Sequence, residues 1–334
     1  MTDCKNVIFS FVGYRRNIAH MPFVNKLTDN ELAVGVARAL SEIFGEQFEF
    51  KSLKNLSFSA CKELKEDSVI SGKLIENKDI SAYAVAYNES SYIYINEEDH
   101  IRFECRETGF NLESCFTRAN KLDDAVLEKL EMAFDVNLGY LTANPQNVGT
   151  GIVVGALLFV PAIVYNKKAK IIKGLLNKYF EFVGLNGEAW NEMSPFVIIK
   201  NGYSFGLKEN EYAEKLKTII QKILEYEINE ENNIFNLTSS TLVDKIFRSY
   251  GILKDAYRLE LEECEIFLGD ILWGINLNLF IRPKNFEILK LFSAVGSAHL
   301  DNGNNLNIKQ QEKIRAIKLS EIISKQIHKG EVDV

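Results

Sequence analysis

The chain has 334 residues, of which 46% are hydrophobic and 25% are charged, and its formal net charge is −7. This is the composition of a folded protein of about two domains, and it argues against intrinsic disorder. A negative net charge also argues against long-range attraction to nucleic acid or to anionic membranes. We therefore expect neither nucleic acid nor a membrane as a partner.

The cysteines, the histidines and the N-terminus argue against several further classes of protein. The five cysteines are dispersed without a CxxC pair and the four histidines are equally scattered, so neither a disulfide framework nor a metal site is predicted. The N-terminus MTDCKNVIF lacks the basic region and cleavage site of a signal peptide. An apolar run at 152–164 is too short to span a bilayer and predicts buried core. A cytoplasmic location is expected.

Residues before about 226 alternate between strand-like and helical patterns. Residues 6–14 are rich in β-branched and aromatic side chains and predict a strand. Thr28 and Glu31 have the spacing of a capping box, which predicts the start of a helix. One face of that helix carries the apolar residues Leu32, Val36, Leu40 and Ile43.

The remaining elements continue this alternation and then become mostly helical. Strands at 80–87 and 92–95 predict a hairpin. They are followed by helices at 122–134 and 168–182, a strand at 195–200 and a helix at 210–226. The polar, asparagine-rich segment 225–238 predicts a linker. Beyond it, helical patterns occur near 241–250, 259–270, 285–294 and 308–328.

Two short stretches carry residues that suggest chemistry. Asn96–Arg102 (NEEDHIR) places three consecutive carboxylates beside a histidine and an arginine, directly after a predicted strand. From charge alone this could be a solvated turn, and His100 is expected to be a hydrogen-bonding scaffold residue. Leu138–Gly151 (LGYLTANPQNVGTG) combines glycines with a proline, which specifies a fixed irregular loop.

In this order and spacing the two stretches resemble the guanidino phosphotransferase family, which includes creatine and arginine kinases. The resemblance is closest to its bacterial protein-arginine kinase branch (McsB type), with its motifs NEEDHxR and GYLTxCPTNxGTGxR. The later branch motifs RGxYGEGS and SNQxTLG correspond to Val183–Trp190 and Lys200–Gly206. Ile246–Leu253 and Trp273–Asn278 resemble the C-terminal helical domain of the branch.

This resemblance implies an α/β (α+β) fold, with an antiparallel sheet flanked by helices and followed by a C-terminal helical domain. The implied catalytic domain spans 1–226, and a helical dimerisation or regulatory domain spans 239–334. The implied reaction moves the γ-phosphoryl group of ATP to a guanidinium nitrogen, which two carboxylates hold. Glu98 and Glu188 stand at those carboxylate positions. Arg102 stands at a nucleotide-contacting position.

The phosphate-binding side departs from the branch pattern. Its SSRxRxxRN motif, anchored on Arg16–Asn17, retains Arg16 as a nucleotide-binding residue. The other family positions are occupied by Phe11, Gly13, Val153 and Val183 in place of arginines, and by Ser68 in place of a histidine expected near the adenine. At about 1.5–3 kcal/mol for each charge-assisted hydrogen bond, four lost arginines remove roughly 6–12 kcal/mol of phosphate affinity. A shift of the alignment by one residue would instead bring Arg15 to the site.

The C-terminal region contains a partial match to the branch motif RDxxRA, which recognises phosphorylated arginine. The aligned residues are Gln311, Glu312, Arg315 and Ala316. An ordinary amphipathic helix with exposed charges is the other interpretation of this stretch.

The sequence therefore predicts a divergent protein-arginine kinase homologue that is a pseudokinase with weak or no ATP binding and no cofactor. It would act as a binding or regulatory subunit in arginine phosphorylation and protein quality control. The resemblance implies a homodimer and the following partners: protein arginine side chains, an active arginine kinase, its zinc-finger activator, or a Clp-type unfoldase. The alternative is an active kinase that uses Mg-ATP, with a phosphate site rebuilt from Arg15, Arg16, Arg102 and Lys167 or Lys168. A third possibility is a pocket for another nucleotide or a small anion.

Overall fold

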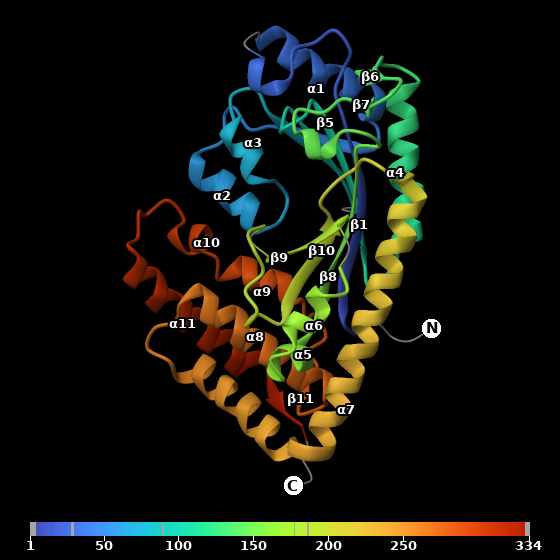
Figure 1. Cartoon of the computed structure of the whole chain (residues 1–334). Coiled ribbons are helices and arrows are strands. Elements are labelled where there is room, and N and C mark those ends of the chain that lie inside the picture. Colours follow the sequence, from blue (N-terminus) through green and yellow to red (C-terminus); the bar gives the residue numbers. More distant parts are fainter. Residues whose placement is uncertain (1–4, 28–29, 89, 177, 186, 331–334) are drawn as a thin grey trace.

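A computed structural model describes residues 5–27, 30–88, 90–176, 178–185 and 187–330, without the side chains of 235–238 (Figure 1). An eight-stranded antiparallel sheet forms its centre, in the strand order β2-β3-β4-β5-β1-β8-β10-β9. Helices lie on both sides of this sheet, and the C-terminal region is helical (Figure 1). The predicted fold class is confirmed.

The bounds of the elements are as follows. The strands of the main sheet are β1 (Val7–Arg16), β2 (Phe48–Ser52), β3 (Ala82–Ala86), β4 (Ser91–Ile95), β5 (Ile101–Thr108), β8 (Ile152–Phe159), β9 (Phe180–Val183) and β10 (Phe196–Asn201). Two short ribbons pair β6 (Phe134–Asp135) with β7 (Gly139–Tyr140), and β11 (Phe280–Ile281) with β12 (His328–Lys329). The helices are α1 (Asn30–Phe44), α2 (Phe58–Glu66), α3 (Gly72–Glu76), α4 (Leu112–Leu127), α5 (Pro161–Tyr165), α6 (Ala169–Lys173), α7 (Glu209–Asp255), α8 (Leu261–Asn276), α9 (Ile288–Ala294), α10 (Ser297–Asp301) and α11 (Ile308–Gln326).

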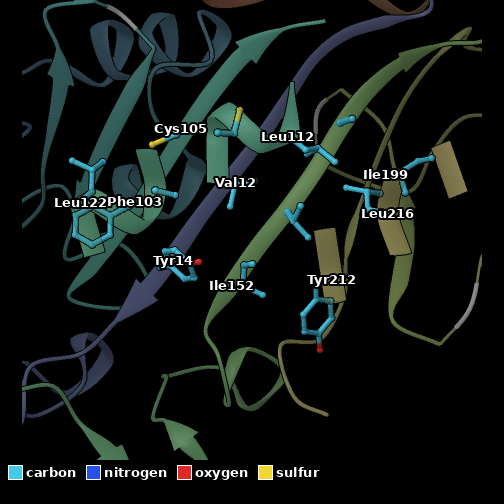
Figure 2. Close-up of a cluster of buried hydrophobic side chains, with 14 of the residues drawn as sticks. Val12, Tyr14, Phe103, Cys105, Leu112, Leu122, Ile152, Ile199, Tyr212 and Leu216 are labelled. Atoms are coloured by element: carbon cyan, nitrogen blue, oxygen red, sulfur yellow. The ribbon is translucent and has the colours of Figure 1, made fainter. Parts of the chain in front are cut away.

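One face of the sheet is covered by α1, α4 and the first part of α7. Strand residues alternate between faces, so Val12 and Tyr14 of β1 point into this core. Figure 2 shows part of it, with Val12 and Ile152 from the sheet and Leu122 and Leu216 from α4 and α7. The core buries the apolar run at 152–159, as the sequence predicts.

The opposite face carries two separate apolar clusters. One packs α2 and α3 against Tyr83 and Tyr94 of β3 and β4. The other packs the C-terminal helices against Leu157, Phe159 and Phe196, at one end of β8 and β10. Between these clusters the strands β1 and β5 present charged side chains, and these form the candidate site described below.

The predicted linker at 225–238 is wrong, because α7 runs without a break from Glu209 to Asp255. The polar residues in this stretch make specific contacts. Both carboxylate oxygens of Glu227 accept backbone N–H bonds at the start of α5, from Ala162 at 2.8 Å and Ile163 at 3.0 Å. Ile234 is buried in the C-terminal cluster. A polar helix that bridges two packed regions has the composition of a linker.

The buried carboxyl group of Glu227 should make the stability of the protein depend on pH. Burial raises its pKa to about 8, against an ordinary value of 4.5. A raised folded-state pKa means that the stability contributed by Glu227 is complete below pH 4.5 and is lost as the pH rises through about 8. We expect the melting temperature to fall by about 1–2 °C per pH unit between pH 5 and 8. Thermal unfolding of Glu227→Gln should have a lower melting temperature at pH 5 and a flatter pH dependence, whereas the exposed control Glu225→Gln should keep the wild-type slope.

Several element boundaries also differ from prediction. The helix predicted at 122–134 begins ten positions earlier, at Leu112. The helix predicted at 168–182 ends at Lys173, and its last part is strand β9, where Phe180 and Val183 are buried. On α1 the buried face is formed by Ala33, Val36, Leu40 and Phe44, and Leu32 is exposed. Thr28 and Asp29 of the predicted capping box, and Cys4, lie outside the described residues.

The other four cysteines lie in the apolar clusters. Cys61, Cys105, Cys115 and Cys264 are buried free thiols. Trp273 is buried in the C-terminal cluster. Within the described ranges no group of three or more histidine, cysteine or acidic side chains is arranged to hold a metal ion. No helix in the same ranges has both the length and the apolar character needed to cross a membrane.

Candidate functional site

Four charged side chains lie on the sheet face opposite the main core. Arg15 of β1 is paired with Arg102 of β5, and alternation along β5 puts Glu104 and Arg106 on the same face. We call Arg15, Arg102, Glu104 and Arg106 the charged strip. Arg15 and Arg102 were expected together only in the alternative of a rebuilt phosphate site, and Glu104 and Arg106 were not predicted as site residues. The sequence does contain a pattern that indicates them: Arg102, Glu104 and Arg106 are charged at every second position, which is typical of one face of a strand.

The arginines of β5 are held in a continuous chain of ion pairs. Glu97 binds Arg102 at 2.8 Å, Arg102 binds Glu104 at 2.5 Å, and Glu104 binds Arg106 at 2.6 Å. Burial opposes ionisation of Glu104, but Arg106 and Arg102 outweigh it and lower its pKa to about 2. Two carboxylates therefore balance the charges of both arginines.

Aromatic rings fix the orientation of these two guanidinium groups. Arg102 lies 4.9 Å from the ring centre of Tyr94, and Arg106 lies 4.4 Å from that of Tyr92. Both tyrosines come from β4, the neighbour of β5. Stacked arginines with fixed carboxylate partners are pre-organised, and a ligand must displace those partners to bind them.

Arg15 differs from its neighbours because its charge is not balanced in the same way. Within the described residues no hydrogen bond or ion pair joins its guanidinium to another side chain, and its Nε is buried without a partner. Burial and the adjacent Arg102 lower its pKa, although Arg15 stays cationic in a protein. Arg15 is thus the arginine of the charged strip without a direct ion pair among the described residues, although Glu97, Asp99 and Glu98 act on its charge at longer range and oppose the lowering of its pKa.

Arg16 points in the opposite direction, into the main core. It is fully buried, its Nη2 binds Asp123 of α4 at 2.6 Å, and its Nη1 donates to the carbonyl of Thr150 at 2.9 Å. The guanidinium also lies 3.6 Å from the ring centre of Tyr140. Because neighbouring residues of a strand face opposite sides, Arg15 and Arg16 cannot share one site. The structure places Arg16 in the main core, where Asp123 and the backbone carbonyl of Thr150 are its partners.

The four family arginine positions are filled by packed, uncharged residues. Phe11, Gly13, Val153 and Val183 are all buried or carry no side chain. A Cβ at Gly13 would lie 1.9 Å from the carbonyl oxygen of Phe103, so the backbone approach leaves no room for any larger residue. The ring of Phe11 covers Gly155, whose Cβ would lie 2.3 Å from the ring. The four positions are therefore packed into the interior of the sheet and its covering segments.

Two lysines, Lys200 and Lys168, each have a carboxylate partner, and Lys167 is exposed. Lys200 of β10 lies beside Gly155 in register and pairs with Glu181 at 3.2 Å. Lys168, one of the lysines proposed to rebuild the phosphate site, binds Glu230 of α7 at 2.7 Å. Lys168 therefore helps to hold the segment between α5 and α6 against α7.

The loop that carries Glu98 is held in place by its neighbours. The Asn17 side chain donates to Asp99 Oδ1 at 2.6 Å and accepts from the backbone N–H of His100 at 2.9 Å. The N–H of Ala143 also donates to Asp99, at 2.7 Å. The two stretches singled out in the sequence thus meet around Asp99. Glu98 itself is only partly buried and accepts from Asn147 Nδ2 at 3.4 Å.

His100 is a scaffold residue, as predicted. Its Nδ1 accepts the backbone N–H of Ile18 at 3.1 Å, and its Nε2 lies 2.9 Å from the carbonyl oxygen of Pro22. Burial lowers its pKa, which favours the neutral ring with its proton on Nε2. Both nitrogens are engaged with backbone, so His100 carries no proton to a substrate.

Glu188 is not brought next to Glu98. It is exposed on the segment that follows β9, and β9 lies four strand positions from β5, about 19 Å across the sheet at the usual strand spacing. Trp190, which follows it, is buried against Phe182 and donates from Nε1 to the carbonyl of Ser194 at 3.1 Å. This anchors the segment on the side away from Glu98.

Ser68, at the predicted adenine-facing position, contributes its backbone. Its φ angle is +58°, in the left-handed region that residues other than glycine seldom adopt. Its carbonyl oxygen accepts a hydrogen bond from Arg106 Nη1 at 2.8 Å. The Ser68 backbone thus contacts the charged strip.

The residues aligned with the phosphoarginine motif serve the fold of the C-terminal region. Arg315 is buried and donates to the carbonyls of Val295 and Leu259 at 2.9 and 3.0 Å and to Ser297 Oγ at 3.3 Å. Ala316 is buried beside it. Gln311 donates to the carbonyl of Leu306, and Glu312 lies 3.6 Å from Arg258. Three of its five guanidinium N–H groups are thus used within the fold, and the side chain is buried.

Comparison with known proteins gives the family. Residues 32–230 match the family model "ATP:guanido phosphotransferase, C-terminal catalytic domain", and residues 239–331 match "Protein-arginine kinase McsB C-terminal domain". The protein-arginine kinase of Clostridium botulinum is 31% identical over 93% of this chain and 95% of its own length. That of Clostridium kluyveri is 32% identical over 93% of this chain and 92% of its own length.

A solved structure agrees with the fold. Lombricine kinase superposes with a TM-score of 0.60 over 70% of this chain and 69% of its own length, at 20% identity. That likeness concerns the fold alone. Together with the two family models and the relatives that match nearly the whole length, it leads to one conclusion: the chain belongs to the ATP:guanido phosphotransferase family, in its McsB-type protein-arginine kinase branch.

Proposed function

We propose that this chain binds arginine side chains of proteins at Glu98 and transfers the γ-phosphoryl group of ATP weakly or not at all. One observation carries the proposal. The two arginines of β5 are already neutralised by Glu97 and Glu104, while the four positions expected to correspond to family arginines carry uncharged residues. A triphosphate needs cations whose charge is available to it.

The energetics oppose binding of a triphosphate at the charged strip. To bind Arg102 or Arg106, a phosphate must break a charge-assisted ion pair and approach the buried Glu104 carboxylate. Among the described residues Arg15 has no ion pair that a phosphate would have to break, although its Nε, like that of Arg102, is buried. The transition state for phosphoryl transfer needs several guanidinium groups at once, so a single one supports little catalysis.

Binding of an arginine side chain from another protein does not require a set of available cations. A carboxylate accepts two parallel N–H bonds from a guanidinium, and Glu98 stands on a loop whose backbone is fixed through Asp99 and Asn17. Glu98 is partly exposed, so it can meet a side chain of another protein without burial of the whole loop.

In the cell we propose a regulatory or binding role in arginine phosphorylation and protein quality control. The partners that fit the family are a second copy of the chain, an active arginine kinase, its zinc-finger activator or a Clp-type unfoldase. We propose residues 1–226 as the guanido phosphotransferase-like domain and 239–334 as the part that mediates dimerisation or regulation. Four buried free thiols fit a reducing compartment such as the cytoplasm.

A second candidate function is active protein-arginine phosphorylation. It is favoured by Arg15, which lies on the charged strip without a described counter-ion. In this case Arg15 would bind the phosphates of Mg-ATP and Glu98 would orient the acceptor. The test is phosphoarginine formation on an unfolded protein at saturating Mg-ATP. A product that disappears in Glu98→Gln would establish this activity and overturn the first proposal.

Arginine binding gives a direct prediction for the first proposal. An extended peptide with one arginine should bind at least about tenfold more tightly to the wild type than to Glu98→Gln, because a charge-assisted pair is lost. Replacing the arginine of the peptide with citrulline should have the same effect. The measurement is fluorescence anisotropy of labelled peptides, with Glu128→Gln as the control for a remote surface charge. Equal affinity of the wild type and Glu98→Gln would contradict the role of Glu98.

A further inference from the structure

The end of α2 contacts both the C-terminal helical region and the charged strip. Helix α2 ends at Glu66, and Asp67 and Ser68 follow it. In Figure 1, α2 lies beside α10 of the C-terminal region, and residues of the two helices are in contact. We call Glu66, Asp67 and Ser68 the clasp.

Glu66 binds the start of α10. Its Oε1 accepts the backbone N–H of Ala298 at 2.8 Å, and its Oε2 accepts that of His299 at 3.0 Å. The same Oε2 lies 3.0 Å from His299 Nδ1. A Cβ at Gly296 would lie 2.3 Å from Glu66 Oε2, so this close approach depends on a glycine at that position.

Asp67 binds the other side of the same histidine. Its Oδ1 lies 3.2 Å from His299 Nε2 and also accepts a hydrogen bond from Ser293 Oγ. The imidazole of His299 therefore lies between two carboxylates of the clasp. These contacts join residues more than 220 positions apart in the chain.

Ser68 carries the connection to the charged strip. Its carbonyl oxygen accepts from Arg106 Nη1 at 2.8 Å, and Arg106 binds Glu104 at 2.6 Å. Since Ser68 has a positive φ angle of +58°, its backbone is held in a conformation that depends on the surrounding contacts. Movement of Asp67 would change the direction of the Ser68 carbonyl.

The start of α10, which the clasp binds, is itself held by Arg315. Its Nε and Nη2 bind the carbonyl of Val295 and Ser297 Oγ, on both sides of Gly296. A continuous set of polar contacts thus runs from α11 through the start of α10 and the clasp to Arg106.

We propose that the clasp positions Arg106 in response to the C-terminal helical region. While α10 holds Glu66 and Asp67, the Ser68 carbonyl keeps Arg106 in its ion pair with Glu104. A partner or ligand that displaces α10 releases Ser68 and makes the Arg106 guanidinium available. The inference rests on the proposed function only for what the charged strip binds, and its test requires no nucleotide, arginine or kinase activity.

The test measures the reactivity of Arg106 itself. The full chain is treated with phenylglyoxal, which modifies accessible guanidinium groups, and the rate at each arginine is followed by peptide mass spectrometry. Arg118 is a matched internal reference, because its side chain is 23% exposed against 22% for Arg106, and each has a glutamate partner. We expect His299→Ala to raise the rate at Arg106 about fivefold, the effect of one lost hydrogen bond, and to leave Arg118 unchanged.

Further variants separate positioning from general stability. His299→Asn keeps a donor near the place of Nδ1 and should restore most of the wild-type rate at Arg106. Glu66→Gln should behave like His299→Ala, and Glu63→Gln, one turn earlier on α2, should not. Ser293→Ala removes a single contact and serves if the larger changes prevent folding. Equal rates at Arg106 in the wild type and in the folded clasp variants, or equal increases at Arg106 and Arg118, would overturn the proposal.

Discussion

Glu104→Gln is expected to bind Mg-ATP at least about tenfold more tightly than the wild type, because it removes the carboxylate partner of Arg106 and one of the two carboxylate partners of Arg102. In the wild type, Arg102 and Arg106 are balanced by Glu97 and Glu104. Glutamine keeps the size of the side chain and removes its charge. The four side chains of the charged strip, which carry a net charge of +2 in the wild type, then carry +3.

The same substitution is expected to destabilise the fold. Removing one member of a buried ion-pair network leaves like charges close together, at a cost of about 3–5 kcal/mol. The low pKa of Glu104, about 2, gives a second signature. The stability contributed by the lowered pKa is present above pH 4.5 and is lost as the pH falls toward 2, so wild-type stability should decline over that range more steeply than that of the variant.

Calorimetric titration and thermal unfolding measure the two effects. Glu107→Gln is the matched control, because Glu107 is on the same strand, faces the other side and pairs with Arg118 at 3.0 Å. Glu107→Gln should leave the affinity for Mg-ATP unchanged. It should also change the dependence of stability on acidic pH less than Glu104→Gln does. If Glu104→Gln bound Mg-ATP no better than the wild type, neutralisation by Glu104 would not be what limits the site.

Arg15 and Arg16 are expected to respond in opposite ways to the same substitution. Arg16→Met should lower the free energy of unfolding by about 3–5 kcal/mol, because it leaves Asp123 buried without its partner. Arg15→Met should leave the fold nearly unchanged, since its guanidinium has no described ionic partner. It should, however, weaken anion binding to the charged strip. Adjacent residues on a strand give this contrast because they face opposite sides of the sheet.

Urea unfolding and binding of inorganic triphosphate distinguish the two roles. The double variant Arg16→Met/Asp123→Leu should recover part of the lost stability, because it removes both buried charges. A large loss of stability in Arg15→Met, or loss of triphosphate binding in a folded Arg16→Met, would reverse the assignment of the two arginines.

The sequence predicted the parts of the site that are encoded in short, continuous stretches of residues. Glu98, Asp99 and His100 follow a strand and meet the 138–151 loop, as expected for two stretches that belong to one site. The strands β1, β3 and β4 were also predicted, because their alternation of β-branched and aromatic residues is strong, whereas the central strand β5 was not.

What the sequence did not predict depends on which side a residue faces and on contacts between distant segments. Arg15 and Arg16 are adjacent, and an alignment anchored on Arg16–Asn17 cannot show that only Arg15 faces Arg102. The linker prediction failed because Glu227 and Glu230 are polar residues whose partners lie more than 60 positions earlier. Likewise, nothing local to Arg315 reveals that the carbonyls of Val295 and Leu259 use its donors.

The most direct test of the account is isothermal titration of the wild-type chain with Mg-ATP at low ionic strength. With the arginines of β5 neutralised and the other arginine positions repacked, the heat change should show no saturation below millimolar nucleotide. Saturable binding in the micromolar range would demonstrate a working phosphate site and refute the central claim.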